Sequence, residues 1–163
     1  MSTRTAASPR GTTSTSRPIL DSVDATHREI LGALTQLEQL VTHLSEHGSD
    51  SVAQQSAAQV CRFFSTVARQ HHLEEERQIF PPLLVRADAE LAQQIQRLQQ
   101  DHGWLEEDWI ELSPLLQAVA EGQNVYEVET LRQGVNVFVN LYHEHIALED
   151  SMIFPAARRQ SQA

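Results

Sequence analysis

The chain has 163 residues, a formal net charge of −10 and a single cysteine, Cys61. This length is typical of one domain with a substantial hydrophobic core, and it is too short for two such domains. All twelve basic residues are arginines and the acidic residues outnumber them, which argues against the clustered basic face that nucleic acid binding requires. The sequence contains neither a long apolar run nor a signal-peptide core, so we expect a cytoplasmic protein without membrane contact or disulfides.

The chain begins with a stretch rich in serine and threonine. Residues 1–18 contain three arginines, no acidic residue and no apolar periodicity, which predicts a disordered tail. An organelle transit peptide has a similar composition, but the amphipathic face that it needs is not evident here. The predicted organisation is therefore a tail over residues 1–18, one folded domain over residues 19–158 and a short tail over residues 159–163.

Four segments follow this tail with the apolar periodicity of amphipathic helices. They are predicted over residues 19–46, over residues 51–80, from about residue 86, and over residues 125–158. Their connections are short and no strand pattern competes with them. The sequence therefore predicts an all-α protein, an up-down-up-down antiparallel four-helix bundle.

Turn residues and prolines set the predicted helix ends. The first helix is expected to end at Gly48, with Asp50 as the N-cap of the second. The second is expected to place Val67 inward, and the helix is expected to stop or restart at the proline pair, residues 81–82. Pro114 is expected to kink or restart the third helix.

Two stretches that lie 74 positions apart repeat one pattern. HHLEEERQIFP, residues 71–81, and HIALEDSMIFP, residues 145–155, both contain a histidine, a glutamate four residues later and a terminal Ile-Phe-Pro. Residues four apart on an α-helix differ by roughly 40° in direction, so the side chains of such a pair project together. Each pair can chelate one metal centre. The pairs are His71 with Glu75 and His145 with Glu149.

The repeat extends to the other two helices. His27 lies 44 residues before His71, and His102 lies 43 residues before His145, each on the apolar face of its own helix. Two repeated helix hairpins would thus bring four imidazoles and at least two carboxylates into one interior, where charges are very costly unless they are paired or bound to metal. We therefore predict a pair of cations. Mixed nitrogen and oxygen ligation suits iron or manganese, with zinc possible.

At these residues the sequence resembles the hemerythrin family, specifically its HHE cation-binding branch, in which a histidine, an HxxxE motif and a sequence like Leu-Phe-Pro occur twice. The resemblance covers about residues 20–157. It implies a non-heme centre of two iron ions that binds O2 at one iron. It also implies terminal iron ligation by four histidines and bridging by two glutamates, namely His27, His71, His102, His145, Glu75 and Glu149.

Two positions depart from the oxygen-carrying relatives. Those relatives have HxxxH on the third helix, whereas this chain has Glu106 four residues after His102, which adds Glu106 to the candidate ligands. An anionic oxygen ligand there would stabilise ferric iron. On the fourth helix the carriers use HxxxxD, which would select Asp150. The internal repeat and the roughly 140° offset of a residue five positions away both favour Glu149 instead.

Neighbours of the candidate ligands are expected to have supporting roles. His72 points roughly 100° away from His71 and is replaced by Ile146 in the second repeat, so we expect it at the surface or behind the ligands. Glu76 and Asp150 are expected to accept hydrogen bonds from the N–H groups of the ligands.

Three function classes fit such a centre. The first is a di-iron protein that binds O2 or a related small oxidant as an oxygen or redox sensor, store or carrier, which requires no substrate cleft. The second is a di-iron enzyme that handles peroxide, nitric oxide or ferrous iron. The third is a structural or iron-sensing bundle that the metal stabilises. A sensor would have to signal through a separate protein partner or through the short tail, because the sequence shows no attached output domain.

Overall fold

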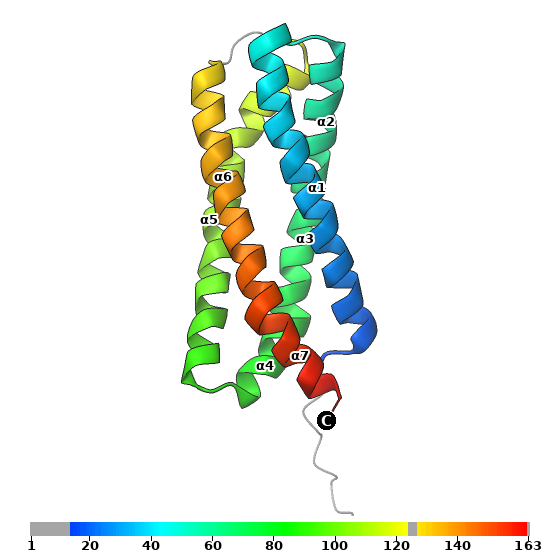
Figure 1. Ribbon diagram of the computed structural model, residues 1–163, viewed down its shortest axis with the longest axis vertical. Helices are drawn as coiled ribbons and strands as arrows, with labels where there is room; N and C mark the ends of the chain where they lie inside the picture. The colour runs from blue at the N-terminus through cyan, green and yellow to red at the C-terminus, as the bar shows by residue number, and fades with distance from the viewer. Residues whose placement is uncertain (1–13, 124–126, 163) are drawn as a thin grey trace, which may run out of the picture.

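The computed structural model describes residues 14–123 and 127–162, and these residues form helices and turns without any strand. Four helical rods lie side by side (Figure 1): first α1 (Arg17–His47); then α2 (Ser51–Ser65), α3 (Val67–Glu74), η1 (Glu75–Ile79) and α4 (Phe80–Arg86); then α5 (Ala89–Ala120); and last α6 (Val128–Leu148), η2 (Glu149–Ile153) and α7 (Phe154–Ser161). α1 packs against α2 and α6, and α5 packs against the same two helices. The predicted antiparallel four-helix bundle is confirmed.

The turn between the first two rods follows from two residues. Gly48 has a φ of 72°, which favours glycine, and its N–H donates to the Leu44 carbonyl at 3.0 Å, so α1 ends there. Asp50 then accepts a hydrogen bond from the Ala53 N–H at 2.9 Å and caps α2. Both predictions are confirmed. The tight turn sets the antiparallel direction of the second rod.

The proline pair does not end the second rod: of the two predicted outcomes, a stop or a restart of the helix, the structure shows the restart. α4 carries Pro81 and Pro82 in its first turn and continues to Arg86. A proline lacks an N–H group and crowds the carbonyl four residues earlier. The π-helical turn η1 precedes the prolines, and in it the Phe80 N–H bonds to the Glu75 carbonyl, five residues back. This wider turn accommodates the prolines, so the helix resumes.

Two other helix predictions need correction. α5 continues through Pro114 as one helix, so the predicted restart does not occur, while the predicted kink stays a prediction. Pro114 lies on the exposed face, where water can satisfy the carbonyl that loses its hydrogen bond. The side chain of Val67 is 39% exposed, because the neighbouring Ala68 takes the inward position on α3.

The predicted domain boundaries differ slightly from the ends of the helices. The Thr15 hydroxyl is buried and donates to the Gln78 carbonyl at 2.6 Å, and α1 starts at Arg17, so part of the predicted 1–18 tail packs on the bundle. α7 extends past residue 158 to Ser161. Residues 1–13 of the predicted tail and residues 124–126, where the sequence predicts the start of the fourth helix, lie outside the described residues.

The interior contains two apolar clusters. Along α1, Val23 belongs to the cluster near the chain termini and Ile30 to the larger cluster in the other half of the bundle. Along α5, Leu98 and Leu105 divide in the same way. Burial of each large aliphatic side chain stabilises the folded state by about 1.5–3 kcal/mol. The two clusters therefore hold the rods together in both halves of the bundle.

No helix among the described residues is long and apolar enough to cross a membrane. The cytoplasmic location expected from the composition stays a prediction.

Candidate metal centre

Six side chains form a polar layer between the two apolar clusters. Every rod contributes a histidine, and the two π-helical turns each contribute a glutamate at their first position: His27 on α1, His71 on α3, Glu75 on η1, His102 on α5, His145 on α6 and Glu149 on η2. None of the six is more than 8% exposed. The structure therefore brings together six of the seven ligands predicted from the sequence.

The two π-helical turns arise from the same local cause. In the second repeat the Phe154 N–H bonds to the Glu149 carbonyl, five residues back, and Pro155 follows directly. The equivalent residues of the first repeat make the same arrangement. The prolines thus explain why the regular α-helix ends at each glutamate, and π-helical turns of this kind are frequent at functional sites.

The carboxylate of Glu75 faces two different groups of imidazoles. Its Oε1 lies 3.8 Å from Nε2 of His27 and contacts Nε2 of His71. Its Oε2 lies 3.6 Å from Nε2 of His102, on the opposite side. One carboxylate whose oxygens face separate imidazole groups has the arrangement of a bridging ligand between two cations.

Glu149 takes a corresponding place from the fourth rod. Its Oε1 lies 3.8 Å from Nε2 of His27 and 2.5 Å from Nε2 of His145. Two sets of potential ligand atoms result, each with its atoms within 4.8 Å of one another: His27, His71, Glu75 and Glu149, and Glu75, His102, His145 and Glu149. The two sets share both glutamates and no histidine.

Acidic residues hold the outer nitrogens of two histidines. His27 Nδ1 donates to Oδ1 of Asp150 at 2.9 Å, and His102 Nδ1 donates to Oε1 of Glu76 at 2.8 Å. The expected hydrogen-bonding roles of Asp150 and Glu76 are confirmed. In a neutral imidazole each bond places the ring proton on Nδ1, so that Nε2, which is directed to the interior, is the nitrogen that can bind a metal.

Hydrogen bonding alone does not satisfy this layer. Among the described residues, ten buried side-chain nitrogen and oxygen atoms lack a hydrogen-bond partner, and nine of them belong to the six clustered side chains. Burying such atoms without a partner costs about 1–3 kcal/mol each. The exception is Oε1 of Gln94. The unpartnered imidazole nitrogens and carboxylate oxygens are the donor set that suits iron or manganese, so the residues fit a pair of cations.

The two buried glutamates have opposite pKa shifts. Burial raises the pKa of Glu149 well above its ordinary value, and the negative charge of Glu75 raises it further. Burial would also raise the pKa of Glu75, but attraction to His71 and the neighbouring imidazoles of His102 and His27 keep it well below its ordinary value. Burial would lower the pKa of His145, whereas the charge of Glu149 and the neighbouring carboxylate of Asp101 raise it to about 10.

Glu106, the seventh predicted ligand, does not join the group. Its side chain is 56% exposed and pairs with Arg69 at 3.1 Å. Leu105 takes the inward position on α5 and is 2% exposed, which turns Glu106 toward solvent. The expectation that Glu106 is a third carboxylate ligand is therefore corrected.

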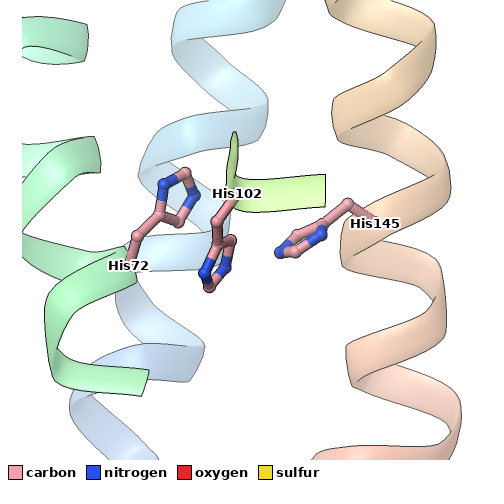
Figure 2. Close-up of side chains that lie close together, drawn as sticks. All are labelled: His72, His102 and His145. Carbon is pink, nitrogen blue, oxygen red and sulfur yellow. The ribbon is translucent and has the colours of Figure 1, made fainter. Parts of the chain in front are cut away.

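His72 is the residue that the sequence analysis missed. Its ring stacks on His102 with centroids 4.2 Å apart, and Figure 2 shows the His72, His102 and His145 rings directed from three helices into one region. One ligand atom of each of these histidines lies within 4.8 Å of the others. The histidine doublet at residues 71–72 was the available signal. The 100° offset between neighbouring helical residues directs His72 toward α5, where the sequence analysis expected a position off the site.

A cavity of about 500 Å³ lies beside this second set of histidines. Its lining includes the His72 and His102 rings and the aromatic side chains of Phe64, Trp109 and Tyr142. Arg69 and Glu106, which form the exposed ion pair, also line it. The metal level is therefore reached by a space much larger than a diatomic molecule needs.

The fold and the buried histidine and carboxylate layer define a class: metal-binding four-helix bundles that hold cations between facing helices. The sequence model of the hemerythrin HHE cation binding domain matches residues 19–157, which is most of the chain, so this chain belongs to that family. An uncharacterized protein of Haemophilus influenzae is 28% identical over 128 residues, which cover 78% of this chain and 72% of the relative. Family membership establishes cation binding as the activity of the domain.

Proposed function

We propose that the chain holds two iron ions as one carboxylate-bridged pair and binds O2 or a related small oxidant there, as an oxygen or redox sensor, store or carrier. One observation carries the proposal: both sets of potential ligands contain Glu75 and Glu149, but each has its own pair of histidines. A single cation would need only one of these sets. If the chain is a sensor, a partner protein would respond to the oxidation or ligand state of the metal pair.

The chain contributes orientation and exclusion of water. His27 and His71 would hold one ion, His102 and His145 the other, with Glu75 and Glu149 between them. Iron supplies the reversible electron exchange with O2 that protein side chains lack. The ring of Phe154 stacks on His27 with centroids 4.8 Å apart and helps to keep water from that side of the layer.

Anaerobic loading with ferrous iron tests this proposal. The purified protein is stripped with a chelator, loaded with ferrous iron, and its iron content and visible spectrum are measured as O2 is added and removed. We expect two irons per chain and an absorption band that appears with O2 and disappears when O2 is removed. Irons that oxidise and stay ferric would contradict reversible O2 binding.

The cavity favours a second candidate function, a di-iron enzyme that handles peroxide, nitric oxide or ferrous iron. A carrier of O2 needs no space of about 500 Å³ next to its metal. The loading experiment distinguishes the two, because an enzyme would accelerate consumption of one of these three substrates in proportion to its iron content. If added iron changes only the melting temperature, the metal has a structural or iron-sensing role instead.

A further inference from the structure

We propose that His72 supplies a third imidazole to the cation held by His102 and His145, so that the two ions have unequal sets of protein ligands. This inference rests on the proposed metal pair and names a ligand that the HxxxE repeat does not contain. The three histidines come from α3, α5 and α6, and their ligand atoms lie within 4.8 Å of one another (Figure 2).

Adjacent residues on α3 serve opposite sides of the layer. The ring of His71 lies against His27 of α1, with centroids 4.8 Å apart, and the ring of His72 lies against His102 of α5, with centroids 4.2 Å apart. The roughly 100° between consecutive helical residues produces this division, because α1 and α5 flank the second rod. A histidine doublet can thus supply one ligand to each ion.

The contacts of His72 leave it available for metal binding. Its Nε2 lies 3.5 Å from the Tyr142 hydroxyl, at the outer limit of hydrogen bonding, which is a weak contact compared with a metal bond. Its ring also lies 5.8 Å from the ring of His145. Glu106, which stands at the sequence position of the second histidine in HxxxH, pairs with Arg69 and does not compete for this place.

Unequal ligation has a chemical consequence. The ion beside His102 and His145 would receive a third imidazole from His72, whereas the ion beside His27 and His71 would receive two imidazoles. The ion with fewer protein ligands keeps more positions for an exogenous molecule.

Chemical rescue tests the inference. His72 lines the cavity of about 500 Å³, so free imidazole has room to enter the space that His72→Gly would open. Cobalt(II) serves as the probe metal, since its visible spectrum reports the number and type of ligands. We expect wild type to bind two cobalt ions and His72→Gly to bind the second at least about tenfold more weakly. Added imidazole should restore both the affinity and the wild-type spectrum.

Matched variants separate ligation from a structural role. His143→Gly removes an exposed histidine on α6 and Glu106→Gln removes the charge of an exposed carboxylate, so both should keep the wild-type affinities and spectrum and should not respond to imidazole. Helicity by circular dichroism confirms that each variant is folded. If His72→Gly misfolds, His72→Gln replaces it, and the expected result is the same weakening of the second ion.

Two outcomes would overturn the inference in different ways. If the folded His72 variants bind two cobalt ions with unchanged affinity and spectrum, His72 is not a ligand, while the proposed metal pair stands. If wild type itself binds fewer than two ions, the proposed pair fails and this inference fails with it.

Discussion

Replacement of Glu75 by glutamine should remove the stabilisation that both metal ions provide, although it changes one residue. The oxygens of Glu75 face His27 and His71 on one side and His102 on the other, so this carboxylate touches both sets of ligands. His27 belongs to one set only. Glu75→Gln should therefore abolish the effect of two ions, and His27→Gln chiefly the effect of one.

The size of the effect follows from binding linkage. An ion at one hundred times its dissociation constant stabilises the folded state by about 2.7 kcal/mol, so two ions contribute about 5 kcal/mol. For a chain of 163 residues, each kcal/mol shifts the melting temperature by about 2–4 °C. Wild type should melt about 10–20 °C higher with ferrous iron than without metal. The shift should fall to about half in His27→Gln and close to zero in Glu75→Gln.

Thermal unfolding followed by circular dichroism measures these shifts, with each protein melted under anaerobic conditions in chelator and again in excess ferrous iron. Glu144→Gln is the matched control, because Glu144 is an exposed glutamate of α6, and it should keep the full wild-type shift. A Glu75→Gln protein that keeps the full metal-induced shift would refute the bridging arrangement.

Three further predictions concern the bundle itself. Gly32→Ala should raise the free energy of unfolding by about 0.8–1 kcal/mol, because Gly32 lies inside α1 and an added Cβ meets no atom within 4 Å; urea titration checks this, and a loss of stability would contradict it. Burial raises the pKa of Cys61 to about 11, so iodoacetamide at pH 8 should alkylate the folded protein far more slowly than protein unfolded in guanidinium; equal rates would show that the thiol is accessible. Two hydrogen bonds that the Asp50 carboxylate accepts, first from the Ala53 N–H and then from His43, lower the pKa of Asp50 from 3.8. Its stabilising contribution is therefore full above pH 3.8 and is lost as the pH falls through the lowered value. Asp50→Ala should destabilise the protein at pH 7, and urea midpoints should show a smaller difference from wild type at pH 2; an equal difference at both pH values would exclude this role.

The fold was predictable because local signals agree with the long-range packing. Gly48 ends one helix and Asp50 begins the next through interactions with residues three or four positions away, which a sequence displays directly. The behaviour at Pro81 was not predictable in this way. Whether a proline ends a helix or follows a π-helical turn depends on how the neighbouring residues pack in the folded protein. Here Ile79 and Phe80, before the prolines, and Leu83, after them, belong to the same apolar cluster.

The candidate ligands likewise fall into two groups, those that local helical spacing predicts and those that depend on tertiary packing. The HxxxE pairs follow from helical spacing within one segment, and the structure places all six residues of the repeat together. Glu106 and His72 depend on how a helix is rotated against its neighbours. Leu105 rather than Glu106 takes the inward position, and α5 lies where His72 can reach His102. The sequence alone does not show how each helix is rotated about its axis relative to its neighbours.

The most direct test of the metal pair is a crystal structure of the iron-loaded protein with anomalous diffraction recorded at the iron absorption edge. We expect two anomalous peaks in the buried layer, both next to the carboxylates of Glu75 and Glu149, with His27 and His71 at one peak and His102 and His145 at the other. A single peak, or iron bound away from these carboxylates, would contradict this expectation.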